Sequence, residues 1–281
     1  MTVLDADKRA AWKSIAVFLV ILALISAVWH VAIVGLAPVS IYVSALMWCP
    51  AVAAFATLKL TGRNIASLPW NIGTWRDNIQ SYLVPVAYVS ISYALAWALG
   101  FGGAFDSGTI SDWSQELGLQ DTPILGAALM AALFATIQFA KSLGTIAGEE
   151  IGWRGFFVWE LRKVLPFGGV ALFSGLVWSA WHYPIVLRYG FGDPVFQIAC
   201  FTLMITGMSV IMAYYTFRSN SLWPAIMFHG AHNIYVQKIF SPLTTRTDQT
   251  RFWIDEYGLI VPVIVAIMAI YYWRRAKAEG M

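Results

Sequence analysis

The sequence predicts an all-α fold, a polytopic integral membrane helical bundle with about eight transmembrane helices. Hydrophobic residues make up 59% of the 281 residues and charged residues only 12%, a composition far from that of a soluble domain. Apolar runs of about twenty residues recur along the chain, and this length crosses about 30 Å of hydrocarbon. Many of the 14 tryptophans lie near the ends of these runs, where aromatic side chains anchor helices at the membrane interface.

Residues 1–122 form the predicted N-terminal three-span region, with spans at 14–36, 41–60 and 81–101. The first apolar run exceeds twenty residues and lacks a small-residue cleavage site, so we expect an uncleaved span and not a signal peptide. An uncharged turn joins the first two spans. Polar linkers follow at 61–80 and 102–122, and the second of them is acidic.

Residues 123–240 form the predicted four-span core. Its first apolar stretch, 123–161, would be about 58 Å long as one straight helix, so it must bend, tilt or include a surface helix. Gly144 and Gly148 are the expected bending points. The other three core spans are predicted at 168–187, 195–217 and 222–240. A last span at 257–273 and a cytoplasmic tail complete the C-terminal region, residues 241–281.

The distribution of basic residues predicts the orientation of the chain. Of the 18 lysines and arginines, 12 fall at one set of span ends, four at the other, and Lys141 and Arg154 lie within spans. Because these residues favour the cytoplasmic side, and eight spans place both chain ends on one side, we expect both termini in the cytoplasm. The net charge of +3, without a clustered basic face, argues against a nucleic-acid partner.

Charged residues inside an apolar run mark the segment 148–155, which contains Glu149, Glu150 and Arg154. Each charge at the centre of a bilayer costs at least about 2.5 to 3.5 kcal/mol, so such residues are expected to face protein or water and to have a function. In a helix, Glu150 and Arg154 lie four residues apart on one face and can pair. Glu149 points about 100° away, and we take it as the candidate catalytic group. The alternative is a structural ion pair with Lys141.

Three further polar residues are predicted to reach the depth of Glu149. Along their helices, His182, His229 and Asn233 lie about 17 to 22 Å from the predicted cytoplasmic ends, and Glu149 lies about 20 Å from its own. His229 and Asn233 are four residues apart and can face one point. His232 can line the same cavity or pack, and interhelical hydrogen bonding is the structural alternative for His229 and Asn233.

These residue types have the chemistry of a peptide hydrolase. A carboxylate and an imidazole can hold a water molecule between them and remove its proton as it attacks a carbonyl. A second imidazole and an amide can donate hydrogen bonds to the oxyanion that develops. The same atoms allow a zinc site, with Glu149, His182 and His229 as ligands and water in the fourth position. The sequence contains no His-Glu-x-x-His motif, which marks the better-known metalloprotease helix.

The pattern Glu149-Glu150-x-x-x-Arg154, His182, and His229-x-x-x-Asn233 resembles the three motifs of the CAAX-protease and bacteriocin-processing family, membrane endopeptidases that include the type II CAAX prenyl endopeptidases. The resemblance covers roughly residues 131–240. It implies that Glu149 and His182 activate water, that His229 and Asn233 stabilise the oxyanion, and that Glu150 with Arg154 holds the helices. Trp178 stands where many members have phenylalanine. The family has been described both as metalloproteases and as metal-free glutamate proteases, and the second description is favoured here.

The sequence is therefore interpreted as an intramembrane endopeptidase acting on a peptide or membrane-protein substrate, with its site opening toward the cytoplasm. We expect no cofactor, while zinc stays an open alternative. The family resemblance places the protein in a bacterial or archaeal cell membrane. Two other function classes are a non-catalytic immunity or peptide-binding protein and a transporter. A transporter is expected to show paired broken helices in two related halves, a repeat that the sequence does not display.

Overall fold

The computed structural model describes residues 3–190 and 192–281, and these residues are almost entirely helical. The predicted all-α membrane bundle is confirmed. Among the described residues, six helical segments are long and apolar enough to cross a membrane: Asp7–Gly35, Ser40–Leu60, Trp75–Ala98, Pro123–Arg162, Phe167–Tyr189 and Pro194–Ser219. The predicted spans at 222–240 and 257–273 are helical too, but they are not among these six. The number eight therefore stays a prediction.

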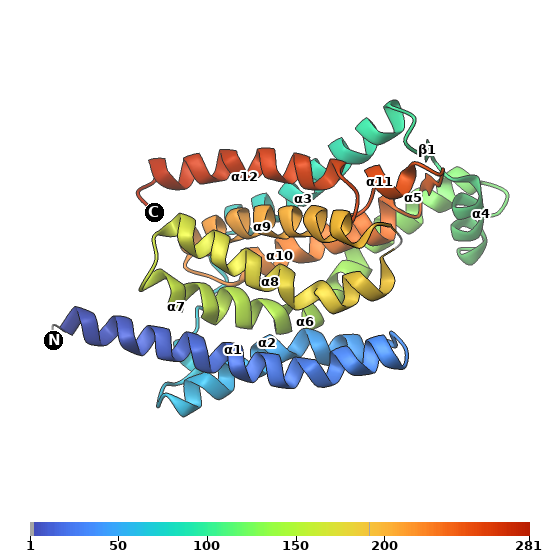
Figure 1. Cartoon of the computed structure of the whole chain (residues 1–281). Helices are drawn as coiled ribbons and strands as arrows, with labels where there is room; N and C mark the ends of the chain where they lie inside the picture. The colour runs from blue at the N-terminus through green and yellow to red at the C-terminus, as the bar shows by residue number, and fades with distance from the viewer. Residues whose placement is uncertain (1–2, 191) are drawn as a thin grey trace.

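The long helices, together with the helical run 123–162, alternate in direction along the chain (Figure 1). Their bounds are α1 (Val3–Gly35), α2 (Ser40–Leu60), α3 (Trp75–Ala98), α8 (Phe167–Tyr189), α9 (Pro194–Ser219), α10 (Trp223–Asn233) and α12 (Ile260–Ala278). Helices α1 and α2 pack together along one edge of the bundle, and α12 packs on α9 along the opposite edge. The beginning of α1 and the end of α12 lie at the same end of the bundle, which we call the terminal end.

Short elements connect these helices. They are the 3-10 helix η1 (Ile65–Ser67), the strands β1 (Gly103–Ala104) and β2 (Thr244–Thr245), which pair antiparallel, and the helices α4 (Ser107–Glu116) and α11 (Thr250–Trp253). The two strands and α4 lie at the end of the bundle opposite the terminal end. We call this end the far end.

The stretch 123–162 is one continuous helical run that contains two π-helical segments. The run consists of α5 (Pro123–Leu133), η2 (Phe134–Gln138), α6 (Phe139–Glu150), η3 (Ile151–Phe157) and α7 (Val158–Arg162). The expected bending points were wrong, since Gly144 and Gly148 both lie inside regular α6. Gly148 instead permits close packing, because a Cβ atom there would lie 2.8 Å from the carbonyl oxygen of Met47. A Cβ at Gly152 would lie 2.4 Å from Pro50.

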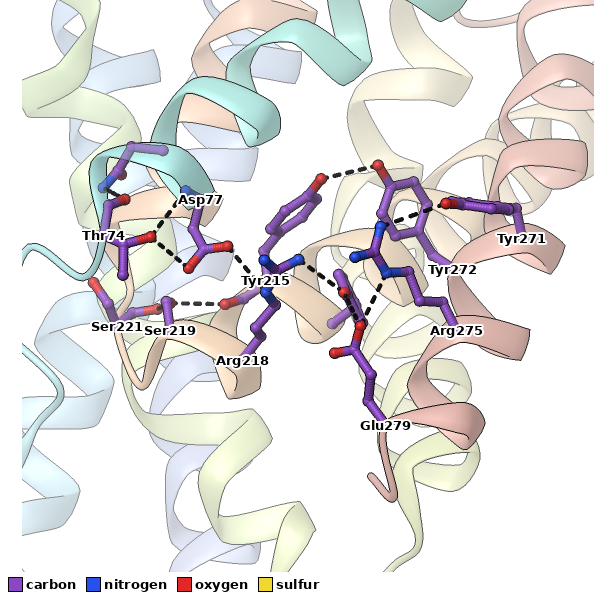
Figure 2. A network of polar contacts seen from close by, with 12 residues as sticks. Thr74, Asp77, Tyr215, Arg218, Ser219, Ser221, Tyr271, Tyr272, Arg275 and Glu279 are labelled. Atoms are coloured by element: carbon purple, nitrogen blue, oxygen red, sulfur yellow. Dashed lines mark hydrogen bonds and ion pairs between the residues drawn. The ribbon is translucent and has the colours of Figure 1, made fainter.

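A polar network ties the helices together at the terminal end (Figure 2). Arg218 at the end of α9 forms an ion pair with Asp77 at the start of α3, with 3.2 Å between Nε and Oδ1. Its Nη1 donates to the hydroxyl of Tyr214 at 3.0 Å, and that hydroxyl donates to Glu279 at 2.8 Å. Arg275 of α12 pairs with Glu279 at 2.9 Å. These bonds fix α3, α9 and α12 relative to one another, so the core helices are held at the end where the basic residues gather.

Candidate active site

Glu149 and Glu150 end α6, and the π-helical segment η3 begins directly after them. A second π-helical segment, η4 (Ile234–Phe240), begins directly after Asn233. Such segments occur frequently at functional sites, because the i to i+5 hydrogen-bond pattern reorients neighbouring side chains. Both π-helical segments therefore directly follow residues that the sequence predicts to belong to the site or to support it.

Glu150 is fully buried and forms the expected ion pair with Arg154. Nη1 of Arg154 lies 3.1 and 3.2 Å from the two carboxylate oxygens. Nδ1 of His229 lies 2.8 Å from Oε1 of the same carboxylate. An ion-paired carboxylate can only accept hydrogen bonds, so Nδ1 of His229 is the donor. Glu150 thus links its own helix to α10.

The buried Arg154 side chain has two more contacts. Its Nη2 donates to the hydroxyl of Ser209 in α9 at 3.1 Å. Its guanidinium carbon lies 4.0 Å from the ring centroid of Trp178 in α8, a cation–π contact. Arg154 therefore connects α8 and α9 to the acidic pair, and both contacts come from residues to which the sequence analysis gave no function.

Trp178 contacts three of the predicted site residues, Glu149, His182 and His229. Its Nε1 donates to Oε2 of Glu149 at 3.0 Å. Its ring lies edge-on to the His229 ring, with 5.3 Å between the centroids. Its backbone carbonyl lies 2.9 Å from Nδ1 of His182. Because a carbonyl can only accept, Nδ1 of His182 carries the hydrogen, and a neutral imidazole then has its lone pair on Nε2.

One cavity of about 270 Å³ is lined by all four predicted site residues, Glu149, His182, His229 and Asn233. Glu149 and His229 are almost completely buried, at 3% and 5% exposure. Glu150 and Arg154 do not line the cavity and lie behind it. The two adjacent glutamates thus face different surroundings, as their angular separation on a helix predicts.

The site was expected to open toward the cytoplasm, the side predicted for both termini, but the cavity extends to the other end of the bundle. It is lined by Ile33 near the end of α1, Pro38 after α1, Tyr189 at the end of α8 and Glu256 before α12. These positions lie at the far end of the bundle. On the terminal side, Trp153, Phe156 and Phe157 are buried and pack around Phe18, so aromatic rings close the bundle below Glu149. The distance of a residue along its helix predicts its depth in the bundle. It does not predict at which end of the bundle aromatic side chains close the cavity.

A larger cavity of about 770 Å³ lies at the terminal end and contains none of the predicted site residues. It is lined by the linker before α3 and by η3 and α7, including Arg63, Trp159 and Lys163. Arg63 and Lys163 both pair with Glu160, at 2.8 and 2.7 Å. Size alone therefore does not identify the site, and the chemistry lies in the smaller cavity.

The remaining polar residues named from the sequence have defined places. His232 is buried. Its Nδ1 lies 2.6 Å from the hydroxyl of Tyr88, and its Nε2 lies 3.1 Å from Oε1 of Glu256. Lys141 is exposed and has no ion pair within residues 3–190 and 192–281, so the alternative pairing with Glu149 does not occur. His30 packs edge-on against Trp181, with 5.8 Å between the ring centroids.

The zinc alternative depends on whether side-chain donors gather around one point. In the part of the chain that the structure describes, no group of three or more His, Cys, Asp or Glu side chains is placed to hold a metal ion. The hydrogen bonds to Oε2 of Glu149 and to Nδ1 of His182 and His229 leave Oε1 of Glu149 and Nε2 of each ring for water. Imidazoles held through Nδ1 in this way are also typical of zinc ligands, so zinc stays an alternative.

Two participants in the site were missed from the sequence. Trp178 lies four residues before His182, so the two share a helix face, and this spacing could have indicated a role for its indole N–H. Glu256 lies outside the predicted core, and only its charge beside an apolar run marks it. Its arrival at the cavity depends on how the segment between α11 and α12 folds back over the bundle.

Two comparisons with known proteins agree with this geometry. Residues 122–235 match the profile of the family described as type II CAAX prenyl endopeptidase Rce1-like. The chain is also 25% identical over 194 residues to CAAX prenyl protease 2 of Methanococcus maripaludis, a match that covers 66% of this chain and 63% of that protein. The profile match contains Glu149, His182, His229 and Asn233 and ends before Glu256. Through this region, the chain is similar to the type II CAAX prenyl endopeptidases of the Rce1-like family.

Proposed function

We propose that this integral membrane protein is an endopeptidase of the glutamate type that hydrolyses peptide bonds at or within the bilayer. One observation carries the proposal: a carboxylate, two imidazoles and an amide from α6, α8 and α10 line a single buried cavity. Similarity to this family supports protease activity, and the buried cavity supports chemistry that is protected from bulk water.

Glu149 and His182 are proposed to activate the attacking water. Oε2 of Glu149 is held by Trp178, which leaves Oε1 to accept a proton from water. Nε2 of His182 has a lone pair and accepts the second water hydrogen as a hydrogen bond. With both hydrogens directed at these acceptors, a lone pair of the water oxygen can attack the substrate carbonyl. Glu149 takes the proton as the carbon–oxygen bond forms and delivers it to the amine as the carbon–nitrogen bond breaks.

His229 and Asn233 are proposed to stabilise the oxyanion. Asn233 lines the cavity and can donate from its amide nitrogen. His229 donates to Glu150 through Nδ1, so donation to the oxyanion requires a second hydrogen on Nε2. Two ionised glutamates and Arg154 have a net charge of −1, and a protonated His229 balances it, which favours such a state in a buried cluster. Loss of one donor of this kind typically costs about 2.7 to 4 kcal/mol of barrier.

Glu150, Arg154 and Ser209 are proposed to position the catalytic groups. Glu150 holds Nδ1 of His229, and Arg154 supports both Glu150 and the face of Trp178. None of the three residues lines the cavity, so they act through their neighbours.

The substrate is proposed to be a peptide or a segment of a membrane protein. The name of the Methanococcus relative indicates that prenylated CAAX proteins are one class to test. From the lysine and arginine distribution we propose that both termini are cytoplasmic, which places the cavity toward the opposite side. Labelling of a cysteine introduced at the C-terminus, in sealed cells and in inverted vesicles, tests the orientation.

The test of the function uses the full chain in proteoliposomes with fluorescence-quenched peptides, including prenylated and unprenylated versions. We expect Glu149→Gln to abolish cleavage while the protein retains its unfolding temperature. Glu116→Gln, which alters an exposed carboxylate on α4, is the matched control and is expected to cleave at the wild-type rate. Peptide binding without cleavage by the wild-type protein would favour the non-catalytic alternative.

A further inference from the structure

We infer that Glu256 recognises a cationic side chain of the substrate, a lysine or arginine close to the cleaved bond. The inference rests on the proposed endopeptidase function and adds a substrate class to it. Glu256 belongs to the segment between α11 and α12, outside the residues 122–235 that match the family profile.

Glu256 lines the same cavity as Glu149 and His182 and lies at its far end. Its Oε1 accepts from Nε2 of His232 at 3.1 Å and from Nε2 of Gln237 at 3.0 Å. Neither bond involves Oε2, and the side chain keeps 17% of its surface exposed. One carboxylate oxygen is thus anchored, and the other is available to a ligand that enters the cavity.

The carboxylate keeps its negative charge in this setting. A neutral His232 satisfies both of its contacts, because the Tyr88 hydroxyl can donate to Nδ1 while Nε2–H donates to Glu256. Burial alone would raise the pKa of the Glu256 carboxyl, but the hydrogen bond and the charge of His232, together with the hydrogen bond from Gln237, outweigh burial and hold the pKa below its usual value. A lysine or arginine side chain that enters the cavity therefore meets an ionised carboxylate.

No lysine or arginine among the described residues lines this cavity, whereas two carboxylates, Glu149 and Glu256, do. The buried Arg154 does not line the cavity, since it pairs with Glu150 and lies against the face of Trp178. The rest of the lining is largely apolar and includes Leu46 and Phe201. A cavity of this kind fits an extended apolar peptide with one positive charge, because a cation inside a low-dielectric site is favourable only beside an opposite charge.

The test scans one lysine through membrane-spanning peptides, with norleucine as the uncharged residue and glutamate as the opposite charge. Full-length protein in proteoliposomes cleaves the set, and mass spectrometry locates each cleaved bond. We expect about tenfold faster cleavage of lysine peptides than of norleucine peptides when the lysine lies within about three residues, roughly 10 Å of extended chain, of the cleaved bond.

Glu256→Gln is expected to remove this preference, so that this variant cleaves the lysine and norleucine peptides at equal rates. Glu256→Lys is expected to shift the preference to the glutamate peptides, and Glu116→Gln on α4 is expected to behave like the wild type. Equal wild-type rates for lysine and norleucine peptides would overturn the inference and leave the proposed function standing. An equal loss for all peptides in Glu256→Gln would assign Glu256 a structural role and also overturn it. No cleavage of any peptide by the wild type would refute the proposed function itself.

Discussion

Trp178→Phe removes the hydrogen bond that holds Glu149 and retains an aromatic ring at the same place. The variant loses the indole N–H that lies 3.0 Å from Oε2 of Glu149. The ring can still lie over Arg154, and the backbone carbonyl can still accept from His182.

The expected magnitude follows from the kind of hydrogen bond that is lost. A hydrogen bond to a charged group contributes about 1.5 to 3 kcal/mol. If the catalytic geometry of Glu149 depends on this bond, kcat should fall by roughly 10- to 100-fold, since about 1.36 kcal/mol corresponds to tenfold in rate. Trp178 acts on the reaction through Glu149, so we expect a much smaller change in KM.

Trp153→Phe is the matched control for this experiment. Trp153 is a buried tryptophan in η3, and its Nε1 has no hydrogen-bond partner within the described chain. Both variants make the same change in side-chain volume, but only Trp178→Phe removes a hydrogen bond to a carboxylate. Steady-state rates in proteoliposomes, together with unfolding temperatures in detergent, compare the two. Equal kcat values for Trp178→Phe and Trp153→Phe would refute the positioning role.

Three other predictions concern stability and cofactors. Arg154→Met removes the guanidinium from the buried ion pair, leaves Glu150 with His229 alone and should lower the free energy of unfolding by about 3 to 5 kcal/mol. A change below about 1 kcal/mol in detergent unfolding, typical of a surface pair, would contradict the buried network. Gly152→Ala forces a methyl group against Pro50 and should lower the free energy of unfolding by about 1 to 3 kcal/mol, whereas Gly144→Ala, with open space around the new methyl group, should leave it unchanged. Equal unfolding temperatures for the two variants would argue against close packing of Gly152 on α2. Treatment with a chelator should leave cleavage unchanged, and a loss of activity that added zinc restores would favour the metal mechanism.

The features that the sequence predicted well depend on short-range geometry. Span lengths follow from hydropathy and the rise of a helix, and the Glu150–Arg154 pair follows from spacing along one helix. The convergence of Glu149, His182 and Asn233 on one cavity follows from their shared depth, since antiparallel helices bring equal depths together.

Features that depend on tertiary packing were not predictable in this way. The role of Trp178 depends on the orientation of its ring relative to another helix. Gly148 was predicted as a bending point because glycine often occurs at bends. In the structure, the absence of a side chain at Gly148 lets the backbone of Met47 in α2 pack closely against it. The direction of the cavity depends on aromatic packing around Phe18, which comes from a helix far away in the sequence. Glu256 lines the cavity because the segment between α11 and α12 folds over it, and the hydrophobic periodicity of the sequence does not predict the path of that segment.

The central claim is that Glu149 and His182 act on one water molecule, and a double-mutant cycle tests it most directly. Glu149→Gln, His182→Ala and the double variant are compared with the wild type by kcat in proteoliposomes. Groups that act as a unit have non-additive effects, so we predict that each single variant loses activity by orders of magnitude and that the double variant is no slower than the worse single one. Wild-type rates in either single variant, or losses that multiply in the double variant, would contradict the account.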